Sequence, residues 1–214
     1  MVYSENILIC IVIPLLISLL FTRKSTRRFI TSLIFGMVIC LISAYISGFI
    51  SFVLEVDQEY TAVYYSPIIE EIMKILPLIF YVIVFEPADD RIFIAALGLG
   101  LGFATFENCC YILSGGAEQI AYVLVRGLAV GVMHLVCALV MVTGICTVRR
   151  FKAFSLSGVI GVLSLSAVFH GLYNLLVSEP GVPTYIGYFL PMVSAVLLYI
   201  PYSRLYQSGN MLSD

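Results

Sequence analysis

Long apolar stretches separated by short polar segments make up most of the chain. They lie near residues 7–21, 29–54, 68–86, 92–112, 119–147, 156–177 and 185–203. A helix needs about 20 apolar residues to cross about 30 Å of hydrocarbon, and most of these stretches approach or exceed that length. The first is short, and 119–147 is long enough to tilt or project beyond the bilayer. The pattern predicts an all-α polytopic membrane bundle of about seven transmembrane helices, forming one domain over residues 1–214.

The composition agrees with a chain embedded in a lipid bilayer. Hydrophobic residues are 61% of the sequence and charged residues 11%, whereas soluble domains are about 25% charged. A nucleic-acid partner is not expected. Basic residues follow alternate helices, so they all fall on one side: Arg23, Lys24, Arg27, Arg28, Arg91, Arg149, Arg150, Lys152 and Arg204. The positive-inside rule therefore predicts an outer N-terminus and a cytoplasmic C-terminus, which places the loop at 55–59 outside. That loop is acidic, which the rule neither requires nor forbids.

Seven ionisable side chains fall inside the apolar stretches. Each costs about 2.5–3.5 kcal/mol near the bilayer centre, so their presence indicates a function. With the predicted orientation, four different helices direct them toward one region near the outer leaflet. They are Glu70, Glu71, Lys74, Glu107, Arg126, His134 and His170.

The spacing of these residues predicts local pairs. Lys74 is three and four residues from the two adjacent glutamates, Glu71 and Glu70, so one lysine can serve both carboxylates. His170 and Asn174 are one turn apart, so the amide can orient the imidazole. Arg126 and His134 are eight residues apart and lie on roughly one face of their helix. No motif assigns Arg126 a role beyond balancing charge or contacting lipid headgroups.

Glycines recur at two places in the predicted helices. Gly98, Gly100 and Gly102 alternate with leucines and no strand precedes them, so they do not form a nucleotide-binding loop. Gly127 and Gly131 form a GxxxG pattern. Both groups predict close packing between helices.

Four ordered motifs resemble those of a known family. They are EExxK in Pro67–Lys74, FxxxE followed by Asn in Gly102–Asn108, His134 within an apolar helix, and HGxYN in His170–Asn174. Together they resemble the PrsW family of bacterial intramembrane proteases and, more distantly, are similar to the CAAX-protease and bacteriocin-processing (ABI) superfamily. The motif-bearing core is residues 67–175. Asn174 stands where many PrsW members carry Asp, which departs from the family pattern.

The resemblance implies peptide-bond hydrolysis by a multi-pass protein of the bacterial plasma membrane. For PrsW it implies the first cut of a single-pass anti-sigma factor, near its extracytoplasmic side, during envelope stress. The catalytic residues that it implies are Glu70, Glu71, Glu107, His134 and His170. The supporting residues are Lys74, Phe103, Asn108 and Asn174. Phe103 lies one turn before Glu107.

The chemistry of these side chains is compatible with a metal-free mechanism, which we favour. Two adjacent carboxylates in a low dielectric cannot both ionise cheaply, which leaves an acid and a base. Either Glu70 or Glu71 then activates water, and either histidine supplies a proton or contacts the oxyanion. Lys74 holds the ionised carboxylate, and Glu107 positions water or a histidine.

Two other interpretations stay open. In the first, zinc is held by His134, His170 and one glutamate, Glu71, which leaves an open position for water. No HExxH motif supports it. In the second, the protein is not a protease but a proton-coupled transporter or a non-catalytic scaffold that binds membrane segments. A transporter needs a second ionisable cluster facing the cytoplasm, and the inner halves of the helices offer almost none.

Overall fold

Helices form nearly all of the protein in the computed structural model, which describes residues 4–20, 22–114, 119–150 and 155–210. The described helices are α1 (Ser4–Ser18), α2 (Lys24–Leu54), α3 (Gln58–Tyr64), α4 (Ser66–Phe85), α5 (Asp89–Leu113), α6 (Ile120–Arg150), α7 (Ser155–Ser178) and α8 (Val182–Asn210). Each predicted apolar stretch forms a helix, and the all-α prediction is confirmed. Of the described helices, α2, α5, α6 and α7 are long and apolar enough to cross a membrane. Lys152, one of the predicted basic-side residues, lies outside the described residues.

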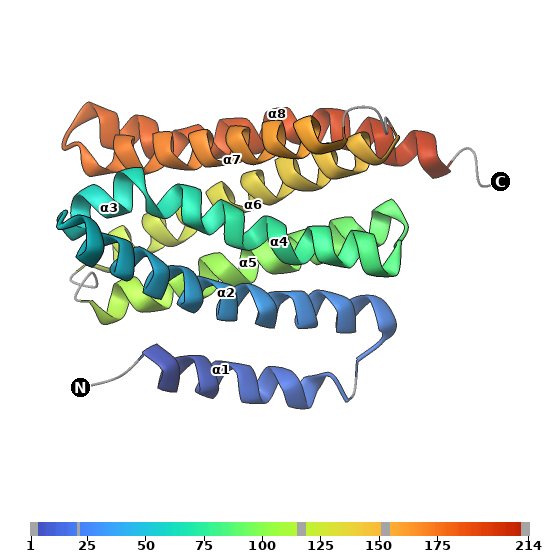
Figure 1. Ribbon diagram of the computed structural model, residues 1–214, viewed down its shortest axis with the longest axis horizontal. Coiled ribbons are helices and arrows are strands. Elements are labelled where there is room, and N and C mark those ends of the chain that lie inside the picture. Colours follow the sequence, from blue (N-terminus) through green and yellow to red (C-terminus); the bar gives the residue numbers. More distant parts are fainter. Residues whose placement is uncertain (1–3, 21, 115–118, 151–154, 211–214) are drawn as a thin grey trace.

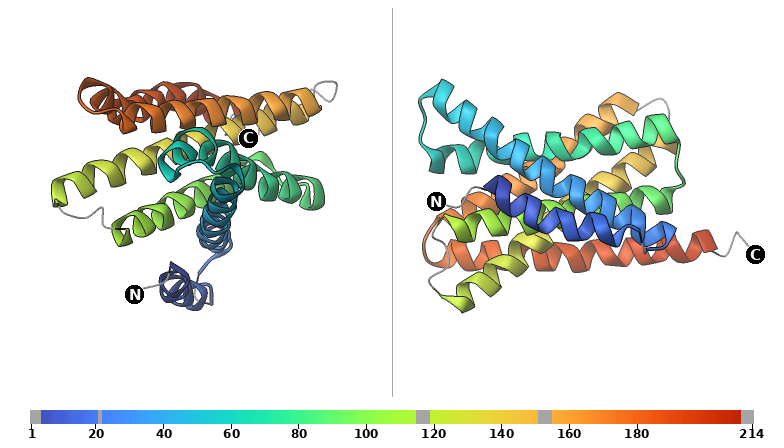
Figure 2. Two further views of the ribbon diagram at one scale, coloured as in Figure 1. Left: turned by 60° about the vertical axis from the view of Figure 1, so that its left-hand side comes forward. Right: turned by 90° about the horizontal axis from the view of Figure 1, so that it is seen from below.

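The helices pack side by side with their turns at two ends (Figure 1). The pair α7 and α8 lies on one side of the bundle, α1 lies on the other against α2, and α4, α5 and α6 lie between them (Figures 1 and 2). At one end, Arg149 of α6 donates to the carbonyl of Pro87 at 2.8 Å and lies 3.4 Å from Asp89. This contact ties α6 to the turn between α4 and α5.

The segment predicted as an acidic outer loop contains a short helix instead. The left-handed backbone of Glu55, with φ of 54°, ends α2. Asp57 then caps α3, because its carboxylate accepts from the backbone N–H of Tyr60 at 2.6 Å. Pro67 occupies the first turn of α4, where its missing N–H costs no hydrogen bond. The sequence prediction missed α3 because a seven-residue capped helix has no long apolar run.

Close backbone contact joins α2 and α5. A Cβ atom added to Gly102 would lie 1.9 Å from the carbonyl oxygen of Leu33, and one added to Gly98 would lie 2.6 Å from that of Phe29. The predicted close packing is therefore confirmed for these glycines. It is wrong for Gly127 and Gly131, since a Cβ on either would meet nothing within 4 Å. A GxxxG spacing offers a flat surface but does not specify a partner helix.

Apolar side chains fill the bundle beyond the ionisable residues, toward the end at which α4 ends and α5 begins. The larger cluster includes Leu78 of α4, Leu99 of α5 and Met141 and Ile145 of α6. A smaller cluster of α5, α6 and α7 includes Met133 and Tyr173. These two clusters set the angles at which α4 to α7 meet, and so position the polar side chains that the same helices carry.

We predict that Gly102→Ala destabilises the protein, because α5 must move away from α2 to accept the methyl group. Overpacking of this kind costs about 1–3 kcal/mol. Thermal unfolding in detergent micelles measures it. Gly161→Ala on α7 is the control, since a Cβ there meets nothing within 4 Å. Equal unfolding temperatures for the two variants would contradict the tight α2–α5 contact.

Candidate active site

The carboxylate of Glu71 is the centre of a buried polar network. Its side chain is 0% exposed. One oxygen, Oε1, accepts from the ammonium of Lys74 at 2.5 Å and from Nδ1 of His170 at 2.7 Å. Because the carboxylate can only accept, Nδ1 of His170 carries its proton. The other ring nitrogen, Nε2, is then available as an acceptor or a ligand.

Both ring nitrogens of His134 have partners. Nδ1 lies 2.9 Å from Nζ of Lys74, and Nε2 lies 2.5 Å from Oε2 of Glu107. An ammonium group can only donate, so Nδ1 accepts and Nε2 donates its proton to Glu107. The ring of Phe103 packs against the imidazole with centroids 4.9 Å apart and lies 4.6 Å from Nζ of Lys74. Phe103 therefore supports a histidine and a lysine, and not only the carboxylate one turn away.

Arg126 belongs to the same network, although the sequence motifs assigned it no role. Its Nη2 atom lies 3.6 Å from Oε1 of Glu107, and its guanidinium carbon lies 3.5 Å from the centroid of the Tyr111 ring. Glu107 is thus held between His134 and Arg126. The signal was present in the sequence, since Arg126 and His134 share a helix face.

Glu70 differs from the neighbouring Glu71 in having no hydrogen bond to any described residue. Its Oε2 atom is buried without a partner and lies 3.7 Å from Nε2 of His170, which is too long for a hydrogen bond. The side chain is 15% exposed, whereas that of Glu71 is 0% exposed. Glu70 and His170 therefore present a free oxygen and a free ring nitrogen toward one another.

Two predicted pairings differ in the structure. Lys74 bonds Glu71 and His134, and no ion pair joins it to Glu70 among the described residues. Asn174 does not orient His170. Its amide donates to the carbonyl of Ala62 at 2.9 Å and so ties α7 to α3. Glu71 performs the orienting role, which no local spacing could reveal because it lies 99 residues from His170. Asn108 makes no hydrogen bond within the described part of the chain.

One group of donors has the chemistry and spacing of a metal site. Ligand atoms of Glu70, His134 and His170 lie within 4.8 Å of one another. Two imidazoles and a carboxylate suit zinc, and the unpartnered Glu70 oxygen fits a ligand. The Glu71–His170 bond matches the carboxylate contact that orients metal-binding histidines. The residues therefore fit a metal ion, provided that His134 exchanges one of its present contacts. The zinc interpretation of the sequence expected Glu71 as the carboxylate ligand. The carboxylate of this group is Glu70 instead, because Oε1 of Glu71 is already bonded to Lys74 and His170.

Comparison with known proteins agrees with this geometry. Residues 24–200 match the PrsW family intramembrane metalloprotease. The chain belongs to this family. The match includes all four helices that carry the polar network, so the protein is a multi-pass membrane protein and, as a PrsW member, a peptidase. No curated protein and no solved structure matches the chain.

We predict that Lys74→Met destabilises the protein strongly, because Glu71 would stay buried without its ammonium partner. Removing one member of a buried ion pair costs about 3–5 kcal/mol, whereas replacing both is often close to neutral. The double variant Glu71→Gln/Lys74→Met should therefore unfold at a higher temperature than the single variant. Thermal unfolding of both in detergent is the measurement. A double variant as unstable as Lys74→Met would argue against a pair that carries charge.

Proposed function

We propose that the protein is an intramembrane endopeptidase that cleaves a membrane-spanning substrate at the Glu70–His134–His170 group. The observation that carries this proposal is the contrast between two adjacent glutamates. Oε1 of Glu71 bonds both Lys74 and His170 in a fully buried position, and its Oε2 is buried without a partner. Glu70 has no hydrogen bond to any described residue, is partly exposed, and faces Nε2 of His170 with Oε2. A buried carboxylate that bonds two neighbours holds them in place, and a partly exposed one without hydrogen bonds is available to water or a ligand.

Each side chain then has a role that follows from its contacts. Glu70 and His170 share the attacking water, which lies beside the 3.7 Å gap between their free atoms, and Glu71 keeps the imidazole in the tautomer with its proton on Nδ1. His134 would stabilise charge on the reacting carbonyl once its Nε2 proton turns from Glu107 to the carbonyl oxygen. Lys74 offsets the negative charge of Glu71. Glu70 takes a proton from the attacking water and then gives it to the leaving amine, so one carboxyl group is in turn the base and the proton donor that amide hydrolysis needs.

The donor set and the family's name favour a metal-assisted form of the reaction. Glu70, His134 and His170 would hold the ion. A bound zinc ion would act as a Lewis acid and make its water a stronger acid. The metal-free mechanism that the sequence suggested remains a second candidate. It is supported by the occupation of both His134 ring nitrogens, and Glu70 would then be the general base on water.

A transporter requires a polar route to both sides of the membrane. The α4 members of the network lie in the first three turns of that helix. The large apolar cluster that includes Ile75, Leu78 and Leu99 follows them in the bundle. This supports a hydrolase at one side of the membrane over a proton relay across it. With basic loops in the cytoplasm, the site lies near the outer surface of a bacterial plasma membrane. A single-pass anti-sigma factor, cut first on that side, is the substrate we propose.

We predict different effects for the two glutamates. Glu70→Gln should lower cleavage of a co-expressed, doubly tagged single-pass reporter by about 10²–10⁴-fold, the usual contribution of a general base. It should leave the unfolding temperature nearly unchanged, because Glu70 loses no hydrogen bond. Glu71→Gln should lower both cleavage and stability. Asp90→Asn, at the exposed start of α5, is the control for removing a carboxylate. Full cleavage by Glu70→Gln would contradict the proposal.

Metal content provides a separate test of the two forms of the reaction. If a metal assists, purified protein should contain about one equivalent, chelation should abolish cleavage, and His170→Ala should reduce the bound metal. Elemental analysis of purified protein, before and after chelation, together with reporter cleavage measures each step. Undiminished cleavage by metal-free protein would contradict the metal-assisted form and favour Glu70 acting on bare water.

A further inference from the structure

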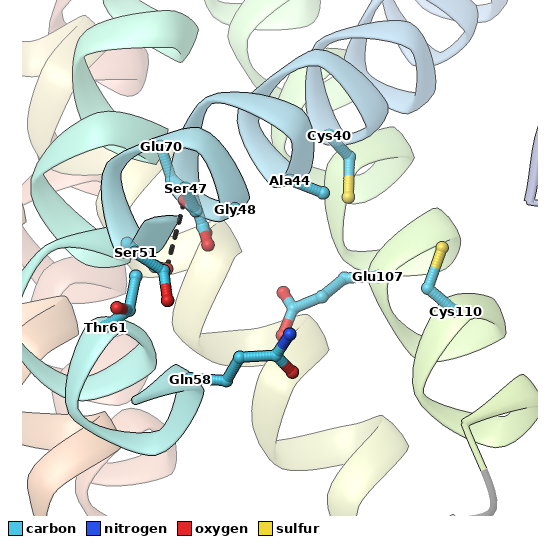
Figure 3. Close-up of a pocket in the computed structure, with 11 residues that line it drawn as sticks. Cys40, Ala44, Ser47, Gly48, Ser51, Gln58, Thr61, Glu70, Glu107 and Cys110 are labelled. Atoms are coloured by element: carbon cyan, nitrogen blue, oxygen red, sulfur yellow. Dashed lines mark hydrogen bonds between the residues drawn. The ribbon is translucent and has the colours of Figure 1, made fainter. Parts of the chain in front are cut away.

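A pocket lined by apolar surface and a few polar groups opens beside the two glutamates that are partly exposed. Its volume is about 310 Å³, and residues of α2, α3, α4 and α5 line it. Glu70 and Glu107 lie along it, as do hydroxyl groups from α2 and α3 (Figure 3). The exposed residues Ala44 and Gly48 of α2 form part of its wall, so the pocket reaches the outside of the bundle.

The lining of this pocket is unusual for a groove on a membrane helix. Ser47 and Ser51 lie one turn apart on α2, and Thr61 faces them from α3. The Ser47 and Ser66 hydroxyls bond one another at 3.1 Å. The carboxamide of Gln58 has no hydrogen-bond partner among the described residues and points toward Glu107 across the pocket (Figure 3). The pocket therefore offers both donors and acceptors at the depth of the catalytic group.

These groups suit an unwound peptide and not a helix. A transmembrane helix satisfies its own backbone, so a hydroxyl-lined wall offers it nothing. An unwound segment exposes N–H and C=O groups whose burial in lipid costs several kcal/mol each unless they are bonded.

We infer that the pocket between α2, α3 and α5 binds the unwound backbone of the substrate next to the scissile bond. The free amide of Gln58 and the hydroxyl of Ser47 can donate to the carbonyls that the unwound substrate exposes. The hydroxyl oxygens of Ser51 and Thr61 can accept from its N–H groups, because their own protons go to the backbone carbonyls of Val56 and Asp57. The occupant is an extended stretch of a membrane-spanning chain, delivered to Glu70 from the side of α2. The inference rests on the proposed function, because a substrate helix has to unwind only if one of its peptide bonds is to be cleaved.

Two adjacent cysteines allow a matched cross-linking test. Cys110 lines the pocket, whereas Cys109, one residue away on α5, does not. The probe is a synthetic leucine-rich single-pass peptide with one cysteine and a central Gly-Pro pair, which interrupts helical hydrogen bonding. All variants carry Cys40→Ala, because Cys40 also lines the pocket. Disulfide formation is followed by non-reducing gel electrophoresis.

We expect Cys110→Ser to reduce cross-linking about tenfold or more, and Cys109→Ser to leave it unchanged. A peptide with Ala-Leu in place of Gly-Pro should cross-link less, since its helix stays intact. Equal cross-linking by the Cys109→Ser and Cys110→Ser variants would overturn the inference. So would equal cross-linking of the two peptides.

A substitution that fills the pocket with a larger side chain provides an activity test. A Cβ on Gly48 would meet nothing within 4 Å, so Gly48→Leu can fill the pocket without displacing the backbone. Reporter cleavage should fall about tenfold or more with unchanged thermal stability, and Gly161→Leu on the exposed face of α7 should cleave normally.

The two hypotheses fail in distinguishable ways. Selective cross-linking to Cys110 by a protein that cleaves nothing would support the pocket and overturn the protease. Cleavage that requires Glu70 but is unaffected by Gly48→Leu would overturn the pocket and leave the protease intact.

Discussion

The buried carboxylate of Glu71 is the constraint on which the rest of the site depends. A carboxylate without water costs several kcal/mol unless charge and hydrogen bonds compensate it. Lys74 supplies the charge from the next turn of α4, and His170 supplies a second hydrogen bond from α7. Lys74 in turn bonds His134 of α6. Satisfying one glutamate therefore fixes three helices relative to one another and sets the orientation of both histidines.

The adjacent glutamates have different roles because of this arrangement. Oε1 of Glu71 bonds Lys74 and His170, whereas Glu70 bonds no described residue and has an oxygen 3.7 Å from a free histidine nitrogen. Glu107 is a further carboxylate of the network. It lies between His134 and Arg126 and is more exposed than Glu70 and Glu71. The reactive side of the cluster is then the side that faces the pocket, and the structural side faces the apolar core. A peptidase working at bilayer depth needs this separation, because its framework must stay dry while its water must have access.

Much of the fold was predictable because the bilayer imposes simple rules. Apolar runs of sufficient length must be helical in lipid, and seven were located correctly as helices. The short helix α3 was missed, and the GxxxG pair at Gly127 and Gly131 was assigned a packing contact that it does not make. Both errors have one origin. A short capped helix and a small-residue surface acquire their roles from the elements beside them, which periodicity does not describe.

For this protein, the sequence by itself identified the ionisable residues that the structure brings together in one network, since such groups inside apolar helices are too costly to be incidental. Its four ordered motifs, within residues 67–175, also indicated the family, and the family match over residues 24–200 confirms it. Only the tertiary structure decided how those residues divide the work. Which glutamate bonds Lys74 and His170, what orients His170, and where Arg126 and Asn174 bond all depend on contacts between distant helices. Local spacing cannot encode these contacts, because they arise from the angles at which the helices pack.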